Sequence, residues 1–203
     1  IPSPSGSEAG LADAIEIPLK GSSHLEVLRS GNTVAARTSL GHSSRLVWAG
    51  HIDTVPAHGN DVARVSDGVL SGRGSVDMKS GVAVGLKLAC ELTNPNVDVT
   101  WIFYDNEEVE TAKNGLGLFG ASHPDWIAGD FAIVGEPSNA QIEGGCNGTL
   151  RFEVTTSGTR AHSARSWMGV NAIHGAAEIL DRLRAYQPGV VEVDGLSYRE
   201  GLN

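Results

Sequence analysis

The sequence predicts an α/β protein with a mainly parallel sheet flanked by helices, followed by a smaller α+β domain. Two observations predict this fold. Strand-like and helix-like segments alternate up to about residue 145, which is typical of a layered α/β fold. From residue 149 the pattern changes, and residues 150–154 alternate apolar and polar side chains as a half-exposed strand does. We therefore place one domain at residues 1–147 and part of a second at residues 148–203.

The elements of the first domain follow from local patterns. Ser5 with Glu8 three residues later is a capping-box pattern and predicts a helix through Leu11 and Ile15. Three short apolar runs predict strands, the first of them buried, and a fourth segment has apolar residues at helical spacing. The strands are residues 46–49, 97–104 and 131–134, and the helix is residues 78–92.

The second domain has a shorter pattern. Residues 171–186 place apolar side chains on one helical stripe, and Gln187-Pro188-Gly189 ends it. Residues 190–193 then predict another strand. One strand, one helix and one strand form the first half of a small α+β domain.

Imidazole and carboxylate groups follow the predicted strands. His51 and Asp53 come after the first strand, Glu107 and Glu108 after the second, and Glu136 after the third. Functional groups in open α/β sheets gather beyond the carboxyl ends of the strands. If the backbone stays extended through Asp53, residues two apart point to the same side, so Asp53 would hold the second nitrogen of a metal-bound His51.

Each signal also has a simpler interpretation. His-x-Asp alone is short and is more often a polar loop at the end of a strand. Asp77, which precedes the helix of residues 78–92, is also explained as an ordinary N-cap. The convergence of several acidic sites is what favours a metal centre.

Charge counting fits two zinc ions. Their four positive charges are balanced by Asp77, Glu136, one carboxylate of the Glu107-Glu108 pair and a bridging hydroxide. The count does not decide which of the pair binds metal and which is the general base. It leaves the second zinc one protein ligand short.

Four separated stretches resemble the dinuclear zinc aminoacylase and carboxypeptidase family. They are AGHIDTVP (49–56), GRGSVDMKSGVAV (72–84), YDNEEVE (104–110) and GEPS (135–138). Four later stretches extend the match over nearly the whole chain and narrow the resemblance within the family. They are GCNGTLRFEV (145–154), GTRAHSARSW (158–167), NAIH (171–174) and YREGLN (198–203).

The resemblance implies a role for each candidate residue. The expected cofactors are two Zn²⁺, with Co²⁺ possible in the second site. His51 and Glu136 would bind the first zinc, Glu108 the second, and Asp77 would bridge the two ions. Glu107 would be the general base, and Asp53 would orient His51. His162 would stabilise the oxyanion in the active site of the neighbouring subunit. A surface histidine in a polar loop is the simpler interpretation of His162.

The chain also departs from the family pattern. The family's last zinc ligand is a histidine near its C-terminus, so we expect this ligand beyond Asn203 and interpret the chain as a fragment. Many relatives have arginines where Cys146 and Asn147 stand. The expected substrate-binding residues are therefore Thr149, Arg160 and Arg165.

The resemblance implies a homodimeric amidohydrolase that dimerises through the second, lid domain. Cysteine usage and the lack of a long apolar run lead us to expect a cytoplasmic enzyme. The expected reaction splits N-succinyl-LL-2,6-diaminopimelate, a small anionic N-acyl amino acid, into succinate and LL-2,6-diaminopimelate. One alternative is another amidase of the family, such as an acetylornithine deacetylase or an aminoacyl-amino-acid hydrolase. A second alternative is a non-catalytic fragment that binds metal or dimerises.

Composition agrees with these expectations. The chain has 15 Lys and Arg against 24 Asp and Glu, a net charge of −9. This balance argues against nucleic acid or an anionic membrane as a partner. Two cysteines give no disulfide framework, which favours a reducing compartment. No apolar run approaches the ~18 residues of a membrane span.

Overall fold

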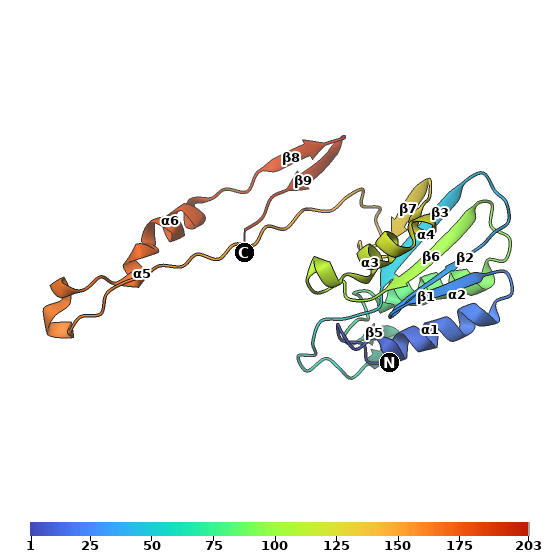
Figure 1. Ribbon diagram of the computed structural model, residues 1–203, viewed down its shortest axis with the longest axis horizontal. Helices are drawn as coiled ribbons and strands as arrows, with labels where there is room; N and C mark the ends of the chain where they lie inside the picture. Colours follow the sequence, from blue (N-terminus) through green and yellow to red (C-terminus); the bar gives the residue numbers. More distant parts are fainter. Residues whose placement is uncertain (203) are drawn as a thin grey trace. The chain divides into compact units, whose positions relative to one another are not determined.

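The computed structural model describes residues 1–202, which form two compact units, Ile1–Ala140 and the chain from Gln141 onward (Figure 1). The first unit is built on a five-stranded sheet. In spatial order its strands are β1 (Glu26–Ser30), β2 (Thr33–Arg37), β6 (Asp98–Tyr104), β3 (Arg45–His51) and β7 (Phe131–Val134). The domain boundary expected at residue 147 concerns the whole protein and stays a prediction.

The sheet is mixed. β3 pairs in parallel with β6 on one side and β7 on the other, whereas β1–β2 and β2–β6 are antiparallel. Trp48 stands opposite Trp101 of β6 and Ile133 of β7. The predicted α/β class is confirmed, and the three strands that were predicted to precede acidic residues are the three parallel ones. Their carboxyl ends therefore lie at one edge of the sheet.

Side chains that alternate along the strands form a core on each face. In β6, Val99, Trp101 and Phe103 join the cluster under α1 (Ala9–Gly21) and α2 (Lys79–Glu91). Ile102 and Tyr104 point the other way and join a second cluster. That cluster also contains Phe119 and Trp126, from α3 (Gly115–Ser122) and α4 (Pro124–Ile127) respectively. Figure 1 shows the two helix pairs on opposite faces of the sheet.

The predicted capping box at Ser5 is wrong, and the simpler interpretation of Asp77 as an N-cap does not hold. Helix α1 begins at Ala9 rather than after Ser5, because the Ser5 hydroxyl donates to Asp53 and the Glu8 carboxylate accepts from Gly6 N instead. Asp77 does not cap α2. That helix begins at Lys79, its N-cap is Met78, and Lys79 N donates to Gly74 O.

The remaining elements of the first unit are small. A hairpin of β4 (Arg64–Ser66) and β5 (Val69–Ser71) precedes the glycine-rich loop, and a 3-10 turn, η1 (Thr111–Lys113), follows β6. All residues of the hairpin strands are exposed.

In the second unit most of the apolar side chains are exposed. The predicted helix at 171–186 is two helices, α5 (Ala172–Gly175) and α6 (Ala177–Ala185). The strand predicted at 190–193 is confirmed as β8 (Val190–Val193), paired with β9 (Leu196–Arg199). Residues 150–154 do not form the predicted strand, since no neighbouring strand pairs with them among the described residues. A 3-10 segment, η2 (Ser163–Met168), completes the unit.

Both cysteines are free thiols, with Cys90 partly buried in α2 and Cys146 exposed. Within residues 1–202, no helix combines the length and the apolar character needed to span a bilayer.

Candidate metal centre

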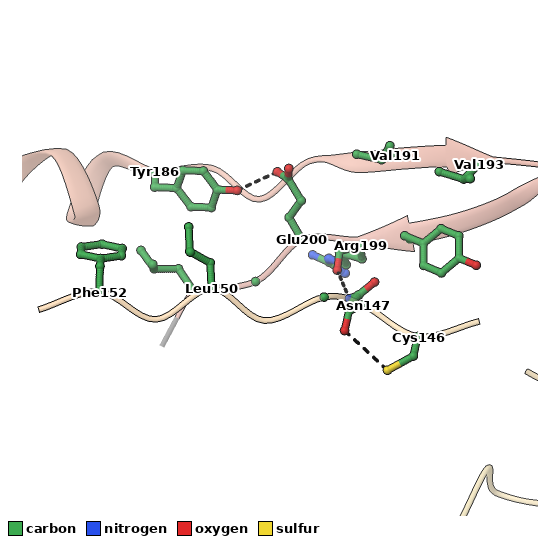
Figure 2. A pocket seen from close by; sticks show the side chains of 13 residues that line it. Cys146, Asn147, Leu150, Phe152, Tyr186, Val191, Val193, Arg199 and Glu200 are labelled. Carbon is green, nitrogen blue, oxygen red and sulfur yellow. Dashed lines mark hydrogen bonds between the residues drawn. The ribbon is translucent and has the colours of Figure 1, made fainter. Parts of the chain in front are cut away.

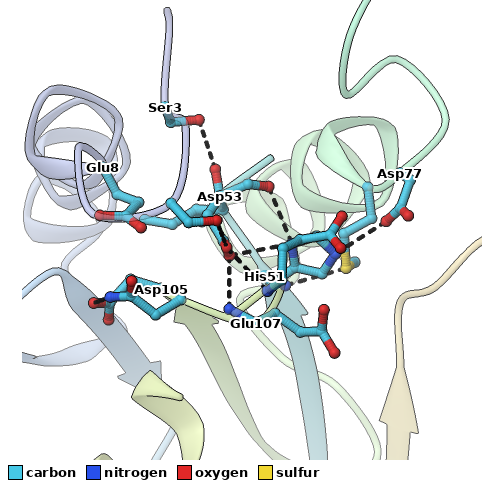
Figure 3. Close-up of polar contacts among 12 residues, drawn as sticks. Ser3, Glu8, His51, Asp53, Asp77, Asp105 and Glu107 are labelled. Carbon is cyan, nitrogen blue, oxygen red and sulfur yellow. Dashed lines mark hydrogen bonds and ion pairs between the residues drawn. The ribbon is translucent and has the colours of Figure 1, made fainter. Parts of the chain in front are cut away.

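His51 is the centre of a cluster of acidic side chains at the carboxyl edge of the sheet. It is the last residue of β3 and is 1% exposed. Its Nε2 lies 3.0 Å from Asp77 Oδ1 and 3.7 Å from Glu136 Oε1. Figure 3 shows the imidazole ring between Asp53 and Asp77.

The parallel register explains why these groups meet. His51 pairs with Tyr104, the last residue of β6, so the chain that leaves β6 delivers Glu107 and Glu108 beside the imidazole. β7 ends at Val134, opposite Ala49, and Glu136 follows two residues later. Three strand ends thus supply the cluster, and the loop before α2 adds Asp77.

Asp53 organises the segment that carries Glu107 and Glu108. Its Oδ1 accepts from the backbone N–H of Glu107 at 3.0 Å, and its Oδ2 accepts from that of Glu108 at 3.2 Å. The Ser5 hydroxyl donates to Oδ2 at 2.7 Å. Nδ1 of His51 lies 3.3 Å from Oδ1 of Asp53 and 3.1 Å from its backbone carbonyl oxygen. One buried carboxylate therefore fixes both the histidine ring and the acidic loop.

The electrostatics of Asp53 follow from these contacts. Burial alone would raise the pKa of its carboxyl, because the charged form loses solvation. The hydrogen bonds from His51, Glu107 N and Ser5 outweigh burial and lower this pKa to about 2. Asp53 is thus a permanent anion near neutral pH.

His51 and two of the glutamates respond to the crowding of negative charge. Burial lowers the pKa of His51, but the hydrogen bond with Asp53 and the charge of Glu136 outweigh it and raise the pKa to about 9. Burial raises the pKa of Glu108 and of Glu136, and the charge of Asp77 raises both further. The cluster therefore holds more negative charge than the protein alone neutralises.

The donor set suits a divalent cation. One ligand atom from each of His51, Asp77 and Glu108 lies within 4.8 Å of the other two. Ligand atoms at zinc bond lengths in a tetrahedron are about 3.4 Å apart, which lies between the two distances measured from His51 Nε2. One imidazole and several carboxylates are ligand types that zinc accepts.

Glu107 is held by its backbone rather than by its carboxylate. Its N–H is fixed on Asp53, and Figure 3 shows its side chain turned away from Asp53. Glu107 as a whole is partly exposed at the same edge of the sheet. This arrangement is compatible with either role that charge counting left open.

The other predicted site residues lie in the second unit. Thr149, Arg160, His162 and Arg165 are all exposed. His162 precedes η2, and its Nδ1 accepts from Ala164 N at 3.1 Å. The roles expected for these four residues stay predictions.

The second unit also contains a groove of about 710 Å³ between its hairpin and the extended segment before residue 153 (Figure 2). Cys146 and Asn147 line it, and the Asn147 side chain donates to Arg199 O at 2.9 Å. Tyr186 donates to the Glu200 carboxylate at 2.7 Å on the opposite side. Of the basic residues expected to bind substrate, neither Arg160 nor Arg165 lines this groove.

The sequence-based prediction missed two contributors. Ser5 was assigned to a helix cap, although it supports Asp53 from 48 residues away in the chain. Tyr104 was assigned only to a strand, yet it is buried beside the cluster with its ring centroid 6.2 Å from that of His51. Burial and then the charge of Glu107 raise the pKa of Tyr104, so it stays neutral.

An α/β unit with an imidazole and several carboxylates at the ends of parallel strands is typical of metal-dependent hydrolases. Residues 47–194 match the family model of peptidase family M20/M25/M40. The chain belongs to this family.

Two relatives match along the full length of the chain. It is 52% identical over 204 residues to the protein DapE of Mycobacterium tuberculosis (strain ATCC 25618 / H37Rv). It is 50% identical over 208 residues to succinyl-diaminopimelate desuccinylase of Corynebacterium glutamicum. The chain spans 58% and 56% of the lengths of these two proteins, respectively.

Solved structures share the fold. A tripeptidase from Staphylococcus aureus superposes with a TM-score of 0.62 at 17% identity, over 98% of this chain and 60% of that one. The aminopeptidase PepT from Bacillus cereus gives 0.56 at 17% identity, over 90% and 53% respectively. At these identities the likeness concerns the fold alone.

Proposed function

We propose that the protein is a metal-dependent amidohydrolase with two divalent cations, zinc in the first site and zinc or cobalt in the second. His51, Asp77 and Glu136 would hold the first ion, and Asp77 and Glu108 the second. The observation that carries this proposal is the position of His51 Nε2, 3.0 Å from Asp77 and 3.7 Å from Glu136. Membership of the M20/M25/M40 family supports it.

When bound, such ions polarise an amide carbonyl and lower the pKa of water toward ~7. The protein's own groups handle the proton and the geometry. Glu107 takes the proton from water and passes it to the departing amine, since its carboxylate is not tied to Asp53. Asp53 keeps His51 and the Glu107 backbone in place.

We propose N-succinyl-LL-2,6-diaminopimelate as the substrate, with succinate and LL-2,6-diaminopimelate as products, a step toward lysine and diaminopimelate. The 50% identity to the C. glutamicum desuccinylase over the whole chain supports this choice. Thr149, Arg160 and Arg165 would bind this substrate. His162 of a second copy of the chain would stabilise the oxyanion that forms during hydrolysis. The proposed enzyme is a cytoplasmic homodimer whose lid domain begins near residue 148. Its last zinc ligand would lie beyond Asn203.

Two measurements on the full-length protein test the proposal. Zinc titration into the chelator-treated protein is expected to give two bound ions per chain. Turnover is then compared on N-succinyl-LL-2,6-diaminopimelate and on N-acetylornithine. Turnover of the second substrate alone would favour another amidase of the family, and no turnover with fewer than two ions would favour a non-catalytic metal-binding protein.

A further inference from the structure

Met78 is a fully buried methionine directly after Asp77. Its sulfur accepts a hydrogen bond from the backbone N–H of His51, with 3.1 Å between nitrogen and sulfur. A thioether is a weak acceptor. The importance of this contact therefore comes from its place in the structure rather than from its strength.

The contact takes the place of a bond between β3 and β7. Gly135 N donates to Ala49 O at 2.8 Å, as a parallel ladder requires. In the regular pattern the next bond would run from His51 N–H to the Gly135 carbonyl. β7 instead ends at Val134, and His51 donates to the Met78 sulfur. The chain therefore leaves the sheet at Gly135 and continues to Glu136. Because the Met78 sulfur accepts from His51, the buried N–H of His51 is not left unpaired.

The methyl group of Met78 occupies a space bounded by three glycines. A Cβ added to Gly50 would lie 2.6 Å from Met78 Cε, and one added to Gly81 or Gly135 would lie 3.0 Å from it. An unbranched methionine side chain suits such an irregular gap. Glycine at these positions lets β3, α2 and the segment after β7 approach this one side chain closely.

We propose that Met78 is a positioning residue for the metal centre. It sets the separation of three groups through their backbones: His51 through the N–H to sulfur contact, Asp77 through the adjoining peptide, and Glu136 through the packing at Gly135. Glu108 is placed by Asp53 and is not part of this arrangement. The inference rests on the metal centre proposed above and adds a residue that binds no metal.

Met78→Leu in the full-length protein tests the inference, because leucine keeps most of the apolar volume and removes the acceptor. We expect about 10- to 100-fold weaker zinc binding, the usual effect of losing a group that orients a ligand. The readout is the zinc dissociation constant from competition with a chromophoric chelator. Leu19→Ala is the control, since Leu19 is a buried member of the same core cluster and lies in α1, which supplies none of the proposed ligands. It should lower thermal stability and leave zinc affinity unchanged.

Gly81→Ala keeps the inference testable if Met78→Leu does not fold. Alanine favours a helix over glycine, but its Cβ would lie 2.3 Å from the Gly135 carbonyl oxygen and must displace it. Zinc binding should weaken while the helix persists. Gly117→Ala is the matched control, since that helical position is open within 4 Å.

The outcomes separate the two proposals. Weaker zinc binding in Met78→Leu, or in Gly81→Ala if the first variant does not fold, supports the positioning role. If the folded variant used for the test binds zinc within twofold of the wild-type affinity, the positioning role of Met78 is wrong, and the proposed metal centre is unaffected. A wild-type protein that binds no zinc overturns the metal centre and this inference together.

Discussion

The carboxylate of Asp53 accepts a hydrogen bond from the backbone N–H of Glu107, although 54 residues separate them in the chain. The same carboxylate lies 3.3 Å from Nδ1 of His51. The proposed base and the proposed zinc ligand are therefore attached to one buried anion. This relationship explains why the loop after β6 presents its acidic side chains beside the end of β3.

Asp53→Asn should lower activity about 10- to 100-fold, as losses of groups that orient metal ligands do. Both carboxylate oxygens of Asp53 accept hydrogen bonds from backbone N–H groups. In the asparagine variant the side-chain NH₂ would replace one of these oxygens and face a backbone N–H that needs an acceptor. The measurement is kcat together with bound zinc per chain. Unchanged kcat in a folded variant would show that this carboxylate does not position the site.

Glu107→Gln should abolish turnover, by at least ~10²-fold, while zinc content stays near two ions per chain. The amide keeps the size of the side chain but takes no proton from water. Glu110→Gln is the control, because Glu110 is exposed and its carboxylate pairs with Lys113. Loss of zinc from the Glu107 variant would instead make Glu107 a ligand and assign the base to Glu108.

Ser5→Ala should cost about 1–3 kcal/mol of stability, since Asp53 loses a donor in a partly buried place. A modest fall in kcat should accompany it, because the first segment of the chain supports Asp53 directly. Urea unfolding and steady-state kinetics measure the two effects. Ser7→Ala, at an exposed position nearby, should change neither.

Asp98 gives a test of pH-dependent stability away from the metal centre. Burial would raise the pKa of its carboxyl, but donors from Leu40 N, Thr38 and His42 N outweigh it and lower the pKa to about 2. A lowered folded-state pKa stabilises the fold above the unfolded value of about 3.9, and this stability is lost as pH falls toward 2.

Asp98→Asn should therefore reduce the free energy of unfolding by about 1–3 kcal/mol at pH 7. Its difference from wild type should shrink between pH 5 and pH 2. Denaturant unfolding at several pH values measures this, with the exposed Asp61→Asn as control. A difference that stays constant with pH would contradict the assigned role of the carboxylate.

Local patterns predicted the strands of the first unit that precede acidic residues. Residues 46–49 and 97–104 have apolar side chains on both faces because they lie between the two core clusters. Residues 131–134 form the exposed edge strand β7 and belong to neither cluster. The approach of Glu136 to His51 follows from the parallel register of β3 and β7. Asp77 reaches His51 from the loop before α2. Fold class and the geometry of the cluster were thus largely accessible from sequence.

The errors arose where a distant partner decides the structure. The Ser5 hydroxyl binds Asp53 instead of a helix end, and such a contact leaves no local periodicity. Asp77 precedes α2 without capping it, since its carboxylate faces His51. Residues 150–154 have the alternation of a strand but no neighbour to pair with in the described chain. The backbone contact of His51 with the Met78 sulfur is equally invisible to local patterns.

The central claim is that His51, Asp77, Glu108 and Glu136 share a pair of cations. A crystal structure of the zinc-loaded full-length protein, with anomalous data collected at the zinc absorption edge, tests it most directly. We expect two anomalous peaks, one within bonding distance of His51, Asp77 and Glu136 and the other within bonding distance of Asp77 and Glu108. Zinc-loaded crystals without a peak beside His51 Nε2 would contradict the account.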